Sequence, residues 1–214
     1  MTLSLQHCVL LFVSFLSLAC AAPTPEELVP RSCITVGPVN ISKLNKTAPN
    51  DYLNGPLFAL HRNGGPNSNT IKSVVSFAYI PPGSTGCMLQ IDIPKLPTRN
   101  TPGPIATGTG TQADAWLITN PPRSNPFDNG FIYEYSWNNP PVKSQFVSTT
   151  IFPTGSPTDA PYKTYMWSGT CKQQLSFEFD LSDWQQGSGD VNFFDTTGGK
   201  SGLTPIGFTM VYNC

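Results

Sequence analysis

The C-terminal part of the chain alternates apolar and polar residues with a period of two. The clearest run is 175–181, Leu-Ser-Phe-Glu-Phe-Asp-Leu, which puts its apolar side chains on one face and Ser176, Glu178 and Asp180 on the other. This period is typical of a strand with one buried and one wet face. Two further runs, 190–195 and 206–213, follow glycine-containing turns. The pattern predicts a three-stranded antiparallel meander that closes at Cys214.

A hairpin is the clearest expectation upstream. Residues 75–79 alternate, the turn 81–86 is rich in Pro and Gly, and residues 87–93 alternate again. Residues 50–70 have the composition of a loop, and no segment has helical periodicity. Short strands joined by Gly/Pro turns predict an all-β fold, a single antiparallel β-sandwich or jelly-roll domain. The remaining strands are expected at 113–119, 131–137, 146–152 and 162–167.

The first residues have the form of a secretory signal. An apolar segment at 8–18 precedes the small residues Ala19-Cys20-Ala21, and it is too short to span a membrane. We expect cleavage after Ala21. A lipoprotein signal at Cys20 is the weaker alternative, because the basic flank is missing. Residues 1–21 are thus the expected signal peptide, 22–32 a flexible leader and 33–214 the domain of a secreted, extracellular protein.

Export predicts disulfides. Cleavage leaves Cys33, Cys87, Cys171 and Cys214, an even set that implies two bridges and allows three pairings. In a meander, the start of the 173–181 strand and the end of the 206–213 strand lie at opposite ends, which disfavours Cys171 with Cys214. Chain termini of one domain often lie close together. The preferred pairing is therefore Cys33 with Cys214 and Cys87 with Cys171.

The distribution of charge indicates which partners are not expected, and two sequons predict N-glycosylation. The 12 Lys and Arg residues and 13 Asp and Glu residues are scattered without runs, so neither nucleic acid nor an anionic membrane is an expected partner. Asn40-Ile-Ser42 and Asn45-Lys-Thr47 satisfy the N-glycosylation sequon. Asn40 and Asn45 are therefore expected to carry glycans on exposed backbone of a eukaryotic exported protein.

Several of these segments resemble a known family. They are Val74–Ile80, Gly86–Ile91, and the C-terminal pattern Cys171, Leu175-Ser-Phe-Glu-Phe179, Trp184, Gly189-Asp-Val191 and Tyr212-Asn-Cys214. Over about residues 70–214 they resemble the C-terminal domain family of the fungal ubiquitin-activating-enzyme-binding protein, the "But-two" domain. The resemblance implies a fungal source, a secreted or cell-surface protein and a β-rich domain. It supplies no catalytic residues, and we do not transfer the intracellular partner to an exported, disulfide-bonded chain.

Candidates for catalysis are few. His61 is the only histidine after cleavage. Without a Gly-x-Ser-x-Gly elbow, we expect it to be a solvated loop residue rather than part of a Ser-His-Asp system. Without a second histidine or a free cysteine, no zinc or copper site is expected. Glu134 or Glu178 could serve glycoside hydrolysis with a second carboxylate; the alternative is a solvated strand face.

Acidic residues also gather around the glycine-containing turn near position 187. They could offer oxygen ligands to calcium, but their spacing matches no calcium loop, so we prefer ordinary turn chemistry and expect no cofactor. The residues are Asp180, Asp183, Asp190, Asn192 and Asp195.

Aromatic side chains follow one face of the predicted strand 131–137. If exposed, the ladder Phe131, Tyr133, Tyr135 and Trp137 would stack on sugar rings; if buried, it would fill the core, which the polar opposite face favours. Tyr133, Tyr135 and Trp137 are the candidate ligand-binding residues. The sequence thus predicts a non-catalytic extracellular protein that binds cell-wall or host glycans or an extracellular protein. The alternative is a carbohydrate-active hydrolase that uses Glu178 or Glu134.

Overall fold

A computed structural model describes residues 32–95, 105–119, 123–124, 131–132, 134–155, 160–197 and 205–214. The expected signal peptide and nearly all of the expected leader lie outside these residues. The described residues form fifteen strands and no helix, so the all-β prediction is confirmed. From Ser32 onward they belong to one compact unit. None of the described segments is a helix that could span a membrane.

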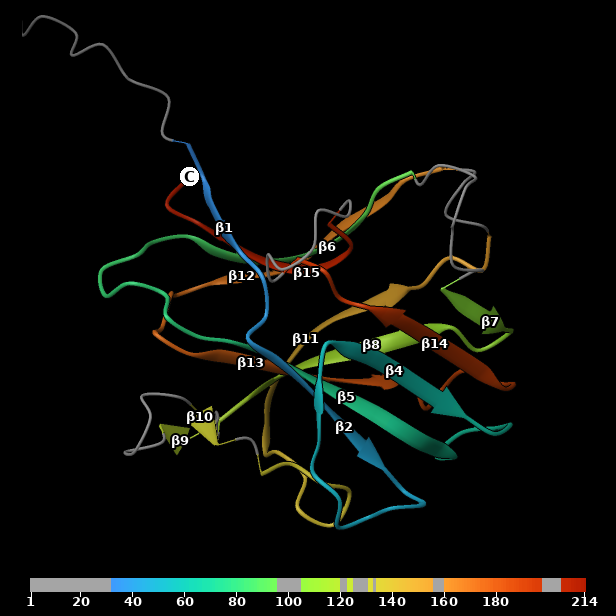
Figure 1. Cartoon of the computed structure of the whole chain (residues 1–214). Coiled ribbons are helices and arrows are strands. Elements are labelled where there is room, and N and C mark those ends of the chain that lie inside the picture. The colour runs from blue at the N-terminus through green and yellow to red at the C-terminus, as the bar shows by residue number, and fades with distance from the viewer. Residues whose placement is uncertain are drawn as a thin grey trace, which may run out of the picture. The chain divides into compact units, whose positions relative to one another are not determined.

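Four strands form the smaller sheet, in the order β1-β15-β6-β12, with every neighbouring pair antiparallel. Figure 1 shows these strands as one layer, with the strands of the larger sheet in the other. Their bounds are Ile34–Val36 for β1, Gly207–Tyr212 for β15, Cys87–Ile93 for β6 and Tyr162–Gly169 for β12.

The larger sheet has nine strands. Its main path is β11-β8-β13-β5-β4-β14-β7, while β2 pairs with β5 and β3 pairs with β2. A separate ribbon pairs β9 (Arg123–Ser124) with β10 (Phe131–Ile132). The bounds in the larger sheet are β2 Asn40–Asn45, β3 Leu53–Gly55, β4 Leu57–Arg62, β5 Asn69–Phe77, β7 Ala106–Gly108, β8 Gln112–Ile118, β11 Lys143–Ile151, β13 Leu175–Leu181 and β14 Gly189–Phe194.

Phenylalanine rings from both sheets meet in the core. Phe58 of β4 and Phe179 of β13 each have a ring centroid 4.9 Å from that of Phe208 on β15, and all three side chains are 0% exposed. Tilted ring pairs of this kind contribute about 0.5–1.5 kcal/mol beyond the burial of their area. These contacts join the two layers into the predicted sandwich.

Two predicted strand arrangements, the hairpin and the meander, are wrong. β5 and β6 do not form a hairpin, because β5 belongs to the larger sheet and β6 to the smaller, so the turn 81–86 carries the chain between layers. β13, β14 and β15 do not form a meander either: β13 lies between β5 and β8, β14 between β4 and β7, and β15 in the smaller sheet. Alternation identifies the buried face of a strand, but it does not choose the partner strand.

Strands also occupy a segment that the sequence pattern predicted to be a loop. Within residues 50–70 lie β3, β4 and the start of β5. β4 reads Leu-Phe-Ala-Leu-His-Arg, with Phe58 and Leu60 each 0% exposed. The Asn and Gly residues around it belong to the turns at either end, and they concealed a six-residue strand.

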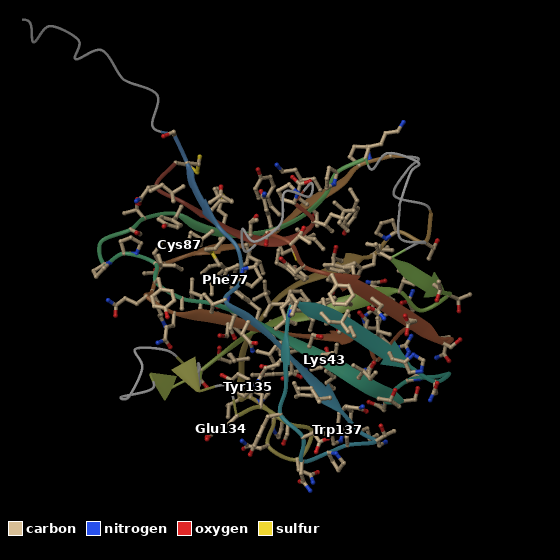
Figure 2. All side chains as sticks on the ribbon, in the orientation of Figure 1. Lys43, Phe77, Cys87, Glu134, Tyr135 and Trp137 are labelled. Carbon is tan, nitrogen blue, oxygen red and sulfur yellow. A yellow bond between two sulfur atoms is a disulfide. The ribbon has the colours of Figure 1, made fainter. Side chains whose placement is uncertain are left out.

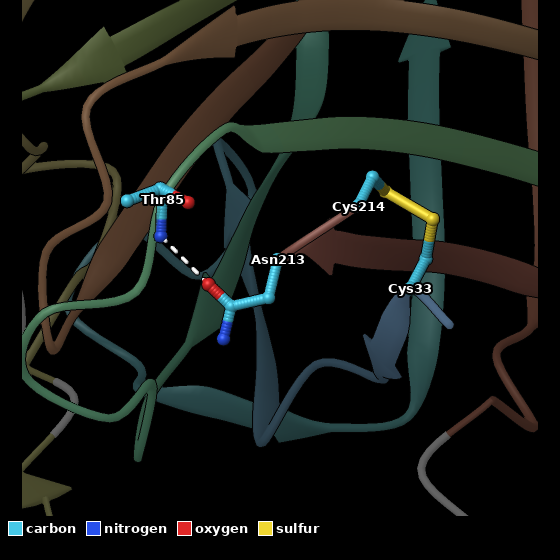
Figure 3. Close-up of a disulfide and its surroundings, with 4 residues drawn as sticks. All are labelled: Cys33, Thr85, Asn213 and Cys214. Atoms are coloured by element: carbon cyan, nitrogen blue, oxygen red, sulfur yellow. Dashed lines mark hydrogen bonds between the residues drawn. A yellow bond between two sulfur atoms is a disulfide. The ribbon is translucent and has the colours of Figure 1, made fainter. Parts of the chain in front are cut away.

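Both disulfides staple strand pairs of the smaller sheet. Cys33 and Cys214 flank β1 and β15, where Ile34 lies opposite Tyr212, and their Cα atoms are 4.2 Å apart. Figure 3 shows this bridge, with the Thr85 backbone N–H donating to Asn213 Oδ1 beside it at 2.8 Å. Cys87 opens β6 opposite the end of β12, just before Cys171, with a Cα separation of 5.1 Å. The preferred pairing is confirmed, although ladder register rather than a meander explains it.

We predict that losing Cys87–Cys171 destabilises the protein more than losing Cys33–Cys214. Loop entropy alone would make Cys33–Cys214 the more stabilising bridge by about 0.7 kcal/mol, because it joins residues 181 positions apart, whereas Cys87–Cys171 joins residues 84 positions apart. However, Cys87 is 0% exposed in the core, so replacement leaves a cavity, whereas Cys33 and Cys214 are exposed. Urea unfolding of the double variants C87A/C171A and C33A/C214A compares the two. A larger loss of unfolding free energy in C33A/C214A would contradict the prediction.

Candidate ligand-binding groove

The predicted aromatic ladder does not lie along one strand. β10 ends at Ile132, Tyr133 lies outside the described residues, and residues 134–137 have irregular backbone. Tyr135 is 5% exposed and packs against Leu44, Val74 and Ile118. These partners alternate with core residues on their strands, so they lie on the outer face of the larger sheet. Tyr135 is therefore buried, as the core interpretation expected, but in a second small cluster outside the sandwich.

Trp137 covers the edge of this cluster and is partly buried. Figure 2 labels it with Glu134 and Tyr135, which belong to the same loop. The Lys72 Nζ atom lies 5.7 Å and the Lys46 Nζ atom 6.0 Å from the centre of the Trp137 ring. Cation–π contacts of this kind contribute about 0.5–2 kcal/mol. The Trp137 ring is thus already engaged by neighbouring cations.

A charged quartet lies on the same outer face, formed by Lys72, Lys143, Glu178 and Asp180. Lys143 Nζ is 2.7 Å from Asp180 Oδ2 and 3.4 Å from Glu178 Oε1, and Lys72 Nζ is 3.1 Å and 3.6 Å from the same atoms. Glu178 is 2% and Asp180 5% exposed. The expectation of a wet polar face on β13 is wrong, because the lysines of β5 and β11 reach across these carboxylates.

Burial and charge pairing shift the pKa values of two members of the quartet, Glu178 and Lys72. Burial raises the pKa of Glu178 above its ordinary value, and the opposing pull of Lys143 and Lys72 only partly offsets it. Burial also acts to lower the pKa of Lys72, but the neighbouring Asp180 and Glu178 carboxylates outweigh it, so that pKa is raised. The second candidate for hydrolysis, Glu134, lies instead in the exposed part of the 134–139 loop, where its carbonyl accepts a hydrogen bond from Asn139 Nδ2 at 2.6 Å.

His61 lies on β4, so its predicted place in a loop is wrong. Its Nδ1 is 3.1 Å from Asp190 Oδ2, and its Nε2 is 2.8 Å from Asn63 Oδ1. Both ring nitrogens therefore have protein partners.

The acids that the sequence groups near position 187 have separate partners in the fold. Asp180 contacts the two lysines of the quartet, Asp183 accepts a hydrogen bond from Asn69 Nδ2 at 3.0 Å, and Asp190 contacts His61. Within the part of the chain that the structure describes, no group of three His, Cys, Asp or Glu residues could hold a metal ion.

A groove of about 820 Å³ opens where the chain crosses from β1 to β2. Sites for small molecules typically measure about 300–1,000 Å³. Four separate segments line it: residues 36–41 at the crossover, Gly55 at the end of β3 with the following Pro56, Ala78–Tyr79 after β5, and residues 195–197 after β14. The groove therefore exists only when both sheets are assembled.

Apolar side chains and one exposed ring form much of its wall. Val36, Pro38 and Ile41 contribute aliphatic surface. Tyr79 is 64% exposed and has a φ of 62°. This left-handed backbone is uncommon for a residue other than Gly or Asn. It lies between the buried residues Ala78 and Ile80, so the chain exposes the tyrosine while burying both of its neighbours.

Asp195 is the buried acid of the groove, at 7% exposure. Its Oδ1 accepts hydrogen bonds from the Thr197 N–H at 2.9 Å and the Thr197 hydroxyl at 2.6 Å, and its Oδ2 accepts one from the Phe208 N–H at 2.7 Å. Burial raises the pKa of Asp195, and these hydrogen bonds only partly offset it. Gly207 has a φ of 129°, and a Cβ there would meet the Asp195 carboxylate. Only glycine fits beside this acid.

The Thr197 hydroxyl explains how a protonated Asp195 would be accommodated. This hydroxyl also lies 2.6 Å from the Phe208 carbonyl oxygen, and its single proton can serve only one of the two acceptors. When Asp195 is protonated, the carboxyl donates to Thr197 and Thr197 donates to Phe208. The raised pKa of Asp195 agrees with this arrangement.

Sequence reasoning missed this groove. It assigned Tyr79 to a strand and Asp195 to turn chemistry, and it had no pattern that connects the two. The one local signal is the Pro and Gly content at 37–38 and 55–56, which marks sharp chain reversals rather than a binding site.

No protein-family model matches this chain, and no curated protein matches it.

We predict that Glu178→Gln gains stability relative to the unmodified protein as pH rises. Because the pKa of Glu178 is raised by folding, its favourable contribution is complete below the unfolded pKa and is lost as pH rises through the folded pKa. Glutamine resembles the protonated acid and does not lose this contribution. The difference in unfolding free energy should therefore move in favour of Glu178→Gln as the pH rises above the ordinary pKa of glutamate.

Chemical denaturation at several pH values measures this difference. The control is Asp92→Asn, which removes a half-exposed ion pair with Lys163 at 3.3 Å and should change the stability by less than about 1 kcal/mol. The prediction is contradicted if the difference in unfolding free energy between Glu178→Gln and the unmodified protein does not change with pH, or if it moves in favour of the unmodified protein as pH rises. Either result would argue against a buried, destabilised carboxylate.

Proposed function

We propose that the protein is an exported, non-catalytic binding protein that holds a neutral glycan in the groove beside Tyr79. The signal-like residues 1–21 and the two disulfides support export, since disulfides persist outside the reducing cytosol. The sequons at Asn40 and Asn45 support a glycoprotein made in a eukaryotic secretory route. The resemblance to the fungal "But-two" C-terminal domain supports a fungal surface protein and a cell-wall polysaccharide as ligand.

The groove itself is the observation that carries the proposal. An exposed aromatic ring can stack on the apolar face of a sugar, and Tyr79 supplies one at the rim. Hydroxyl groups of Thr196 and Thr197 and the Asn40 residue add polar groups beside the apolar wall. This mixture of apolar surface with a few polar groups is typical of small-molecule and sugar sites.

The charge of the groove favours a neutral sugar. Among the described residues that line it there is no Lys or Arg, and Asp195 is the single acid. An anionic glycan would need a cation to offset its desolvation. A neutral polysaccharide needs only hydrogen bonds and ring contacts.

The carboxylates favour binding over hydrolysis. Glycoside hydrolysis generally uses two acids that flank the scissile bond, whereas the described lining of the groove offers Asp195 alone. Glu178, the first candidate for a hydrolase, is 2% exposed and contacts two lysines. A substrate would have to displace these partners to reach it.

We predict that Tyr79→Ala weakens binding to insoluble cell-wall polysaccharide by about 10-fold, which corresponds to about 1.4 kcal/mol. The physical reason is the loss of one stacking surface at the rim of the groove. Sedimentation of the purified exported protein with β-glucan and with chitin measures the affinity. Tyr165→Ala is the matched control, because Tyr165 is 61% exposed on β12 and does not line the groove.

Two results would overturn the proposal. An equal loss of affinity for the polysaccharide in Tyr79→Ala and Tyr165→Ala would mean that the groove is not the binding site. Reducing ends that accumulate with the unmodified protein and vanish in Glu178→Gln would replace binding by hydrolysis.

A further inference from the structure

The two sequons of β2 lie in different structural settings. Asn40 opens the strand, which lies between β3 and β5, and Asn45 ends it. N-glycosylation joins sugar C1 to the asparagine Nδ2 atom, while the bond from C1 to the pyrophosphate oxygen of a lipid-linked oligosaccharide breaks and one Nδ2 proton leaves. A modified asparagine therefore keeps one N–H where it had two.

Asn40 uses its Nδ2 atom within the fold. This atom donates to Ser42 Oγ at 2.9 Å and to Asn54 Oδ1 at 3.0 Å, and Ser42 Oγ donates to Asn54 Oδ1 at 2.7 Å. Ser42, which completes the sequon, is 0% exposed. A sugar on Nδ2 removes at least one of these hydrogen bonds and must displace Ser42 or Asn54, which both lie against that atom.

The turn that Asn45 forms uses its Oδ1 atom and not its Nδ2 atom. The Oδ1 atom accepts hydrogen bonds from the Thr47 N–H at 3.0 Å and from the Thr47 hydroxyl at 2.8 Å. This is an Asx turn, which the side chain forms with residues of its own segment. Both hydrogen bonds survive modification of Nδ2, and the neighbouring Lys46 and Thr47 are exposed.

The two settings also differ in when they can form. The Asn45 turn joins residues two positions apart, so it needs no other part of the fold and can form in the nascent chain. The Asn40 network needs Asn54, 14 residues away. The enzyme that transfers the oligosaccharide acts on chains that are not yet folded. The native structure therefore does not determine which asparagine the enzyme reaches. It determines which of the modified chains can fold correctly.

We infer that Asn45 carries the N-linked glycan of the exported protein and that Asn40 stays unmodified. The inference rests on the proposed eukaryotic export. Asn40 lines the groove and Asn45 does not, so this pattern keeps the glycan out of the groove and leaves the binding surface beside Tyr79 open.

Glycopeptide mapping tests the inference. The full chain is expressed in a eukaryotic secretory host, and protein from the medium is treated with peptide-N-glycosidase in ¹⁸O water, which marks each formerly glycosylated Asn as ¹⁸O-labelled Asp. We expect the label at Asn45 and none at Asn40. Thr47→Ala, which removes the second sequon but keeps Asn45, should reach the medium without a glycan, and Ser42→Ala should keep the glycan at Asn45.

The outcomes separate this inference from the proposed function. A label at Asn40 in exported protein, or a glycan that persists in Thr47→Ala, would overturn the inference and leave export intact. A chain that stays inside the cell with neither asparagine modified would overturn export itself, and the inference with it.

Discussion

The contact of Phe208 with Phe58 and Phe179 is the interaction on which the other features depend. It joins the smaller sheet to the larger one through rings that are 0% exposed, with centroids 4.9 Å apart. The backbone of Phe208 also positions two residues that line the groove, because its N–H donates to Asp195 and its carbonyl lies beside the Thr197 hydroxyl. The core contact between the layers and the position of the buried acid are therefore set by one residue.

β13, in the middle of the larger sheet, is covered on both faces, although its residues alternate as if one face were wet. On the outer side of the sheet the quartet pairs Glu178 and Asp180 with Lys72 and Lys143, and Tyr135 packs over a second apolar cluster. Burying such groups requires partners for each of them. Once these partners are in place, the outer face over β13 offers little surface to a ligand. The groove at the β1–β2 crossover instead combines volume with an exposed ring.

Buried polar anchors also hold the loops at one end of the larger sheet. Arg62 is 0% exposed; its Nε donates to the Gly187 carbonyl at 3.1 Å and its Nη1 to the Ser182 carbonyl at 2.5 Å. The guanidinium thus ties the end of β4 to the loop between β13 and β14. From the sequence alone, Arg62 is one more charged residue beside a glycine-rich turn, because nothing local reveals that carbonyls 120 or more positions away will surround it.

The sequence by itself determined the all-β class and the core-facing side of β13. It also predicted both disulfides, although one step towards their pairing assumed a meander that the fold does not contain. Side-chain alternation follows from the geometry of a single strand, so Leu175, Phe177 and Phe179 reveal their common face without knowledge of any partner. Only the tertiary structure decided that β5 and β6 lie in different sheets, that Tyr135 is buried outside the sandwich, and that Tyr79 and Asp195 share a groove. Those features depend on contacts between segments that are far apart in the sequence, as with Ser76 and Ser176, which are 100 positions apart. Which distant segments meet is settled by packing and backbone pairing across the whole domain, and a local pattern contains no record of that choice.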